Sequence, residues 1–539
     1  MHAAELIQHL NTAYAISVYV ENGKLKTRSA GAELDPVAVD LIRSNKEALI
    51  RFLDTAGEVR AARTDGIALR RDRLEAAVLS FAQQRLWFID QFERNAAYNM
   101  PAALRLSGVL DRAALRRTLD RIVARHDILR TRFVDSGGEP RQIADLASTF
   151  ALTEHDLCAL DAAQQEAAVA ELSSAEAQAG FDLASGPLIR GRLLQLHTQE
   201  HVLLLTQHHI VSDGWSSGVL VKEVSALYAA FSQGQPDPLP ALGIQYADYA
   251  AWQRERLQGA ALRAQLDYWR GQLADLPAVH SLPLDRPRPA RQQFDGGRLL
   301  QDVDAATLAG LNALARRHDA SLFMLLQAAF AVLVARWSGE SDIVIGTPIA
   351  GRLHPDVEPL IGFFVNTLVL RSDLSANPTF EQLLAQAKAT ALAAYEHQEI
   401  PFEMLVDELK PARSLAHSPL FQLMFTLQNN AAKQLELPGL SLAPVTARHG
   451  QVKCDLELQA TETEQGLKLA WNYATGLFDA ATIARLGDSF GRLLQGIVTA
   501  PQQPVLQLPL LSPGERAQVV QAFNDTAADL GAEALVHQL

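Results

Sequence analysis

Residues 201–231 combine a buried-strand pattern, a polar turn and a helical pattern, and this order constrains the fold more than any other feature. The stretch HVLLLTQ at 201–207 is short and rich in branched apolar residues, which predicts a buried strand. The apolar residues after the turn recur at helical spacing: Leu220, Val224, Leu227 and Phe231. The turn itself, HHIVSDG at 208–214, therefore lies where side chains are held rigidly and still reach a cleft.

Strand and helical signals alternate from residue 76 to about residue 510, which predicts a mixed α/β architecture. A chain of 539 residues is too long for one core. The stretch LPLDRPRP at 282–289 is a stiff, extended connection, so we expect a split into two lobes near residues 250–290. Helices are predicted at 110–125 and 320–337, and the second is apolar nearly all round, which predicts burial between layers.

The composition excludes several classes of function. The net charge of −13 argues against nucleic acid as the main partner. No stretch approaches the ~20 apolar residues that a membrane span needs, and the first residues lack the pattern of a signal peptide. Cys158 and Cys454 are too few for a disulfide framework or a four-ligand zinc site. We therefore predict a cytoplasmic protein without a metal centre.

Residues 1–57 are predicted to form a separate small unit, followed by a charged linker at 58–75. Asn22-Gly23 separates two β-prone runs, which is a strong hairpin signal because such a turn needs positive φ at both positions. Helices are expected before this hairpin and from Pro36 to about residue 52. Three cations alternate on the second hairpin strand and share one face, which is either a solvated edge or a binding surface: Lys24, Lys26 and Arg28.

Three interpretations compete for the polar turn. A metal site needs more ligands, and adjacent histidines at a strand end direct their rings to opposite sides. In a structural interpretation, His208 and His209 satisfy hydrogen bonds within the core. In a catalytic interpretation, one imidazole handles a proton in a cleft, as an ordinary pKa of ~6.5 allows. Asp213 then needs an arginine partner, because a buried carboxylate is costly unless paired, and Gly214 permits a tight turn or close approach of the substrate.

The turn resembles the HHxxxDG motif of condensation domains of non-ribosomal peptide synthetases. Six further segments are similar to the other motifs of that family and occur in the same order. The seven segments are SFAQQRLW at 80–87, RHDILRTRF at 125–133, HHIVSDG at 208–214, YADYAAW at 246–252, IGTPIAGR at 345–352, IGFFVNT at 361–367 and HQEIPF at 397–402.

The resemblance implies two chloramphenicol-acetyltransferase-like lobes arranged in a V, with a tunnel at their junction. The expected units are a docking domain at 1–57, a linker at 58–75, an N-lobe at 76–255 and a C-lobe at 256–510. Residues 511–539 resemble the start of a linker towards an adenylation domain. The sequence shows no adenylation core or carrier serine motif, so amino-acid activation is not expected of this chain.

The implied reaction joins two substrates held as thioesters on the phosphopantetheine arms of donor and acceptor carrier proteins, with no cofactor bound by the chain itself. The α-amine of the acceptor attacks the donor thioester, and an amide forms. By family correspondence, His209 is the catalytic candidate. It either removes a proton from the amine or orients the amine and stabilises the tetrahedral state. Positioning, with some base character, is the favoured hypothesis.

The neighbouring residues receive hypotheses of their own. His208 is expected to pack structurally beside the loop, and Arg85 and Arg352 are the two candidate partners of Asp213. Trp215 is assigned to the tunnel region, although core packing is favoured over substrate contact.

Ser216 and Asn366 are also assigned to the tunnel. For Asn366, hydrogen bonding towards the tunnel and capping of a turn are equally weighted alternatives.

The N-terminal unit resembles the β-hairpin docking domains of synthetase subunits. In those domains the hairpin receives a short, often acidic C-terminal segment of the upstream subunit by strand addition, a role that suits Lys24, Lys26 and Arg28. Downstream, the resemblance implies an acceptor carrier protein and an adenylation domain.

Several related functions remain as alternatives. The RLWFIDQF stretch at 85–92 resembles domains that join an L-configured donor to an L acceptor. A dual epimerising and condensing domain and a catalytically silent recruitment platform stay open. Heterocyclising relatives are disfavoured, because they carry aspartates where this chain has His208 and His209.

Overall fold

The computed structural model describes residues 66–526 except 71, 74, 93–95, 413, 429–434 and 446–449, and before them the strands β1 (Ile16–Glu21) and β2 (Lys24–Ser29) and residues 39, 42, 43 and 46. β1 and β2 pair antiparallel with Glu21 opposite Lys24, which confirms the two strands of the predicted hairpin. The Asn22-Gly23 turn, the helix expected at the N-terminus and most of the linker at 58–75 lie outside the described residues, as does most of the helix expected after Pro36.

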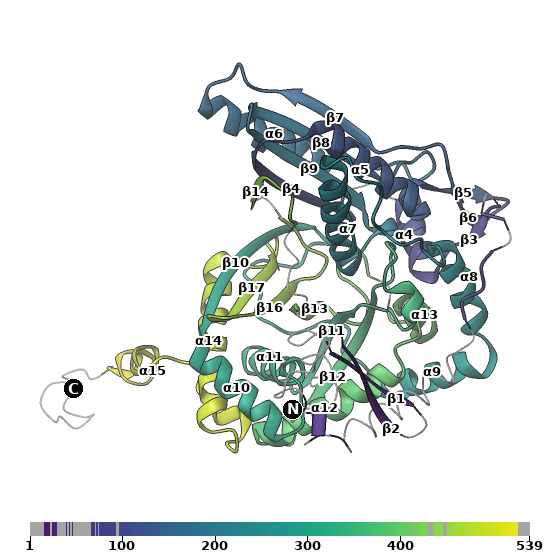
Figure 1. Ribbon diagram of the computed structural model, residues 1–539. Helices are drawn as coiled ribbons and strands as arrows, with labels where there is room; N and C mark the ends of the chain where they lie inside the picture. The colour runs from purple at the N-terminus through teal and green to yellow at the C-terminus, as the bar shows by residue number, and fades with distance from the viewer. Residues whose placement is uncertain are drawn as a thin grey trace, which may run out of the picture.

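The first half of the described chain, together with β14 (Leu440–Pro444), builds two sheets, one of five strands in the order β14-β4-β9-β8-β7 and one of three in the order β3-β6-β5. Helices α5 and α7 lie side by side against the larger sheet (Figure 1). The elements are β3 (Ala77–Val78), α4 (Phe81–Phe92), β4 (Asn99–Gly108), α5 (Arg112–Arg125), β5 (Thr131–Ser136), β6 (Glu139–Ala144), β7 (Ala151–Asp156), α6 (Ala162–Gln178), β8 (Ile189–His197), β9 (Glu200–His208), α7 (Gly214–Ser232), α8 (Tyr246–Arg256) and α9 (Gly259–Gln272).

Strand β9 is the predicted buried strand, and it is covered on both faces. Successive side chains of a strand point to opposite faces. Accordingly, Leu203 packs in the cluster that includes residues of α5 and α7, whereas Val202 and Leu204 pack with Val169 of α6. Burial on both sides explains why this run is continuously apolar rather than alternating.

The second half builds a seven-stranded sheet in the order β12-β11-β13-β16-β17-β10-β15. Figure 1 shows α10, α11 and α14 gathered around this sheet, with α15 projecting beyond it. The elements are β10 (Asp295–Asp304), α10 (Ala305–Arg317), α11 (Leu322–Ser338), β11 (Asp342–Ile349), β12 (Asn366–Asp373), α12 (Phe380–Glu396), α13 (Phe402–Leu409), β13 (Leu423–Gln428), β14 (Leu440–Pro444), β15 (Gly450–Gln451), β16 (Leu456–Thr463), β17 (Gly466–Ala474), α14 (Ala480–Thr499) and α15 (Pro513–Val520).

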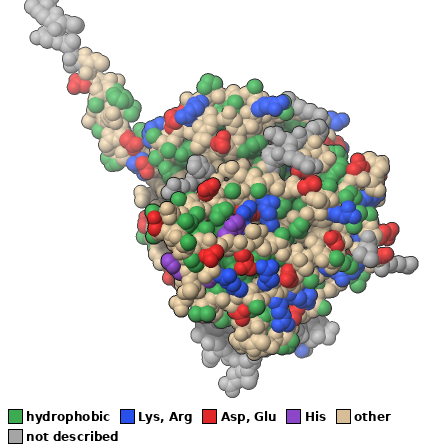
Figure 2. All heavy atoms as spheres, turned by 90° about the horizontal axis from the view of Figure 1, so that it is seen from above, with side chains coloured by type: hydrophobic (Ala, Val, Ile, Leu, Met, Phe, Trp, Pro, Cys, Tyr) green, Lys and Arg blue, Asp and Glu red, His purple; other side chains and the backbone are tan. Residues whose placement is uncertain are grey.

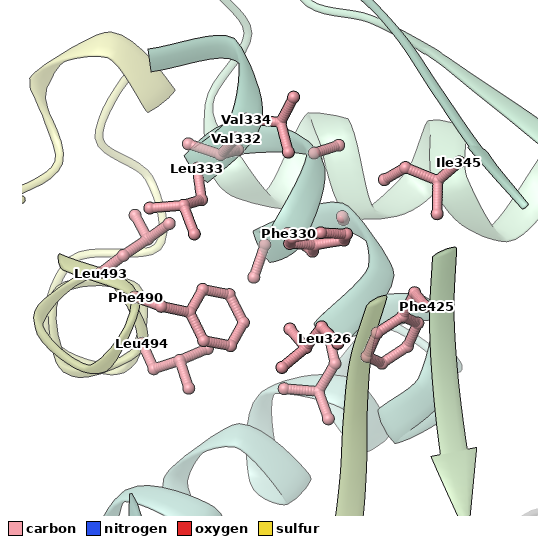
Figure 3. Packing of buried hydrophobic residues seen from close by; sticks show 14 of the residues in the cluster. Leu326, Phe330, Val332, Leu333, Val334, Ile345, Phe425, Phe490, Leu493 and Leu494 are labelled. Atoms are coloured by element: carbon pink, nitrogen blue, oxygen red, sulfur yellow. The ribbon is translucent and has the colours of Figure 1, made fainter. Parts of the chain in front are cut away.

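Helix α11 is the predicted helix that is buried all round. The Ser321 side chain caps its first turn, and Gly339, with a φ of 77°, ends it in the left-handed conformation that glycine adopts readily. Phe330 is fully buried between Phe490 of α14 and Phe425 of β13 (Figure 3). This packing makes α11 the centre of the larger hydrophobic core.

Strand β14 connects the two halves of the fold. It follows the strands of the second half in the chain, yet it pairs antiparallel with β4, with Leu442 opposite Leu106. The five-stranded sheet is therefore completed by residues that come more than 300 positions later in the sequence.

No single described helix is long and apolar enough to cross a bilayer, and the α10–α11 pair, which passes that test only jointly, is bent by 107° at its break. The described residues also contain no group of three or more His, Cys, Asp or Glu side chains placed to hold a metal ion.

Figure 2 shows acidic and basic side chains interspersed on the face seen from above.

Candidate active site

The HHIVSDG turn lies between β9 and α7, as its flanking patterns predict. β9 ends at His208, a single 3₁₀ turn covers His209–Val211, and α7 begins at Gly214. Asp213 is the N-cap of α7, and its Oδ1 accepts a hydrogen bond from the Ser216 backbone N–H at 2.8 Å. Capping by an aspartate satisfies one of the free N–H groups at the helix start and fixes the entry angle of the chain.

His209 is held in one orientation. Its backbone N–H donates to the Tyr98 carbonyl at 2.8 Å, and its ring meets the Phe363 ring edge to face with centroids 4.8 Å apart. Nδ1 lies 2.8 Å from the Ser212 carbonyl oxygen. Because a carbonyl can only accept, Nδ1 carries the proton and Nε2 is left with a free lone pair.

The environment keeps the His209 imidazole neutral. Burial, and next the positive charge of Lys453, lower the pKa of His209 to about 3. At neutral pH the side chain therefore offers Nε2 as a hydrogen-bond acceptor, and it is a weak base rather than one matched to pH 7.

His208 has the surroundings of a structural residue. It is buried, its Nδ1 accepts the Ile210 backbone N–H at 3.1 Å, and its ring packs edge-on against Phe181. Burial, with a smaller contribution from Lys453, lowers its pKa to about 4. This geometry favours the hypothesis that His208 supports the loop.

Asp213 pairs with Arg352 across 3.5 Å, and both side chains are only 2% exposed. The other carboxylate oxygen of Asp213 accepts the Phe364 backbone N–H at 2.9 Å. Arg352 also donates to the Ser216 hydroxyl at 2.8 Å and to the Leu360 carbonyl at 2.9 Å. The ion pair thus connects the start of α7 to the segment at 351–366.

Arg85, the second candidate partner of Asp213, is placed elsewhere. Its guanidinium pairs with Glu403 of α13 at 2.9 Å and lies 5.6 Å from the Phe402 ring centroid. The prediction that Arg85 supports the loop is therefore wrong, because its guanidinium is paired with Glu403.

The structure corrects the tunnel assignment of Ser216. Of the two alternatives for Asn366 it favours the turn cap, and Asn366 also lines a hollow beside the site. The Ser216 hydroxyl is buried and donates to the Gly362 carbonyl at 2.8 Å. The Asn366 amide donates to the carbonyls of Gln398 and Ile400, and its oxygen accepts two backbone N–H groups. Both polar groups are thus engaged within the protein, and Asn366 acts as a turn cap.

Trp215 differs from its prediction, and for Gly214 one of the two predicted alternatives is excluded. Trp215 is 36% exposed and donates from Nε1 to the Glu358 carbonyl at 3.2 Å, so the core-packing hypothesis is wrong. Gly214 lies on the helix start outside the left-handed region, and a Cβ there would meet nothing within 4 Å. A tight turn is therefore not what requires glycine, and close approach of a substrate remains a prediction.

A hollow that is partly open to solvent lies beside the site, between α8 and the segments 351–366 and 398–401. Phe363 lines this hollow and also touches the His209 ring. The sequence did not single out Phe363, although it lies inside the motif at 361–367, and no pattern in the sequence marks Lys453.

The lowered histidine pKa values predict loss of stability in acid. Below pH 6.5 the unfolded chain binds a proton on His208 that the folded chain binds only near pH 4, so the free energy of unfolding falls as the pH falls. From pH 7 to pH 5 this histidine contributes a loss of about 2 kcal/mol. We expect the His208→Asn variant to lose less stability over that range in thermal unfolding. Equal losses would contradict the prediction.

Comparison with known proteins agrees with this geometry. Residues 74–520 match the condensation-domain family. One of the linear gramicidin synthase proteins of Brevibacillus parabrevis is 46% identical over 464 residues, which are 86% of this chain and only 6% of that protein. Malpinin synthetase of Mortierella alpina is 43% identical over 462 residues, again 86% of this chain and 6% of the relative. The chain thus spans a small part of the length of the curated relatives it matches.

Two solved structures share the fold. The X-domain from teicoplanin biosynthesis is 31% identical with a TM-score of 0.75, covering 82% of this chain and 99% of that one. A four-domain nonribosomal peptide synthetase bound to AMP and glycine is 25% identical with a TM-score of 0.74, covering 85% and 35%. The mixed α/β fold is thus that of condensation domains, with two chloramphenicol-acetyltransferase-like lobes. The chain belongs to the condensation-domain family of non-ribosomal peptide synthetases, amide-forming acyltransferases that make peptide bonds between carrier-bound substrates.

Proposed function

We propose that this chain joins a donor acyl or peptidyl thioester to the α-amine of an acceptor aminoacyl thioester, with His209 at the reacting atoms. The observation that carries the proposal is the neutral His209 ring, whose Nδ1–H is fixed on the Ser212 carbonyl and whose Nε2 is free to accept. Both substrates arrive on phosphopantetheine arms of carrier proteins, and the chain binds no cofactor of its own.

The geometry favours positioning over full proton removal by His209. An acceptor amine that donates to Nε2 is oriented with its lone pair towards the thioester carbon, and such alignment supplies much of the rate in reactions of activated acyl groups. A pKa of about 3 makes the imidazole too weak a base to hold the proton at neutral pH. Asp213 and Arg352 maintain the position of the loop without touching the substrate.

A recruitment platform is the second candidate function. One solved relative, 29% identical with a TM-score of 0.74, is the X-domain in complex with OxyB from teicoplanin biosynthesis, so this fold also serves as a binding surface. The present chain keeps both histidines of its motif, which supports catalysis. The RLWFIDQF stretch supports an L-configured donor, and dual epimerisation and condensation is the remaining alternative.

The test is single-turnover amide formation between two loaded carrier proteins, with L- and D-configured donors compared. We expect product from the wild type, faster with the L donor. A preference for the D product after loading with either donor would instead indicate the dual activity. Absence of product with every donor, while both carriers bind, would overturn the proposal in favour of a platform.

The β1–β2 pair is proposed to receive an acidic C-terminal segment of an upstream protein of the same assembly line. An added strand gains main-chain hydrogen bonds, and the cations that alternate along β2 supply charge complementarity. The triple variant Lys24→Glu/Lys26→Glu/Arg28→Glu should lose binding to an acidic peptide by at least tenfold in fluorescence anisotropy. Wild-type binding should weaken with added salt. Unchanged affinity in the triple variant would contradict a docking role.

A further inference from the structure

Lys453 is exposed to solvent, yet protein groups also surround its ammonium. Desolvation is the main cause that lowers the pKa of its ammonium to about 8. Its neighbours in the sequence, Val452 and Cys454, are both buried.

The backbone at Lys453 is fixed from several sides. The Lys453 carbonyl accepts hydrogen bonds from Gln292 Nε2 at 3.1 Å and from the Ser418 hydroxyl at 3.3 Å. Two residues later, the buried carboxylate of Asp455 pairs with His280 at 2.9 Å and with Arg288 at 2.6 Å. The bend between β15 and β16 that carries Lys453 is therefore fixed, and a fixed backbone restricts where the ammonium can reach.

The ammonium of Lys453 faces the HHIVSDG turn. It lies 5.4 Å from the centroid of the Tyr98 ring, and Tyr98 is the residue whose carbonyl holds the backbone N–H of His209. Its positive charge acts on both histidine rings and lowers the pKa of each. The lysine thus reaches from the second half of the fold to the reaction centre in the first half.

Charged and titratable groups of both signs surround Lys453. Glu457 of β16 favours its charged form, whereas Arg85 of α4 disfavours it. Arg85 is itself paired with Glu403. Cys454 is a buried thiol whose pKa is raised well above its usual value, so it stays neutral. With a pKa of about 8, Lys453 therefore keeps most of its charge at neutral pH, and this charge lowers the pKa of His209.

We infer that Lys453 is a positioning residue for the condensation reaction, whose positive charge at the reaction centre excludes the protonated acceptor and admits the free amine. This inference rests on the proposed function. An α-amino group has an ordinary pKa of about 7.7–8.0, so at pH 7 most acceptor molecules in water are ammonium ions that cannot attack. A fixed cation repels the ammonium form and lowers the pKa of the bound acceptor.

The reaction balances without any further reagent. One ammonium proton leaves to solvent before the attack. The nitrogen lone pair then forms the bond to the thioester carbon, the C–S bond breaks, and its electron pair leaves with sulfur. The second proton lost from nitrogen ends on the departing thiolate, which gives an amide and a free thiol.

The test compares Lys453→Met, Lys453→Arg and wild type in the pH profile of single-turnover amide formation. We expect Lys453→Met to be about tenfold slower at pH 7, with the difference closing above pH 9, where the wild-type lysine has itself lost its charge. Lys453→Arg should keep the wild-type rate at pH 7. Lys468→Met, an exposed lysine of β17, is the matched control. A uniform rate loss at all pH values, or no loss, would overturn the inference.

A second readout does not depend on activity. In histidine-labelled protein, the NMR titration of His209 should move to higher pH in Lys453→Met and stay in place in Lys468→Met. An unmoved titration would overturn the inference even if the wild type forms product. If the wild type forms no product while the titration moves, the proposed function fails and the placement of the charge stands.

Discussion

Replacing His209 with alanine is expected to lower single-turnover amide formation by about 100-fold, the size of loss that misalignment of reacting groups causes. The substitution removes the Nε2 acceptor and leaves the backbone N–H bond to Tyr98 available. Binding of both loaded carrier proteins should be unchanged, because the loss concerns the alignment of the amine rather than carrier docking.

The matched control is His197→Ala. His197 is exposed at the opposite end of the β8–β9 hairpin, so its removal should leave the rate unchanged. A His209→Gln variant separates the two roles, since an amide oxygen can accept a hydrogen bond but cannot take a proton. Partial retention of rate in His209→Gln supports positioning. Full activity in His209→Ala would remove this residue from the reaction.

The second large effect is expected from Asp213→Ala, which should reduce the free energy of unfolding by about 3–5 kcal/mol. Arg352 would be left buried without its carboxylate, and the N–H groups of Ser216 and Phe364 would lose their acceptor. We expect a clear drop in the thermal unfolding midpoint, together with lost activity, because the His209 loop is no longer fixed.

Two controls identify the cause. The double variant Asp213→Ala/Arg352→Met should recover part of the stability, since it removes the uncompensated charge. Asp267→Ala breaks the exposed ion pair with Arg270 and should change stability by less than about 1 kcal/mol. If the losses in the free energy of unfolding caused by Asp213→Ala and Arg352→Met simply add in the double variant, the buried-charge explanation is wrong.

Local patterns predicted much of the fold. The helices expected at 110–125 and 320–337 are α5 and α11, and the buried strand before the HHIVSDG turn is β9. These elements were readable because their apolar spacing reports burial directly. β14 was not predicted. Its five residues have one exposed face, and a pattern this short does not indicate with which distant strand they pair.

The parts of the site that a motif specifies by residue type could be predicted from the sequence. The partners that those residues contact in the folded protein could not. The partner of Asp213 depends on which guanidinium lies near the start of α7. Arg352 does, whereas Arg85 pairs with Glu403. The engagement of Asn366 with Gln398 and Ile400 likewise arises only when two segments meet. No local sequence pattern marks Lys453, because its proposed role depends on its position near His209, which belongs to the other lobe.

Completion of the first sheet by β14 has a consequence for synthesis on the ribosome. Until residues 440–444 emerge, β4 pairs with β9 on one side only and is an edge strand, whose other side exposes backbone N–H and C=O groups. A nascent chain that stalls before this point presents that edge to other nascent chains on the same messenger, and such edges favour aggregation. Translation speed between β9 and β14 should therefore influence the yield of folded protein.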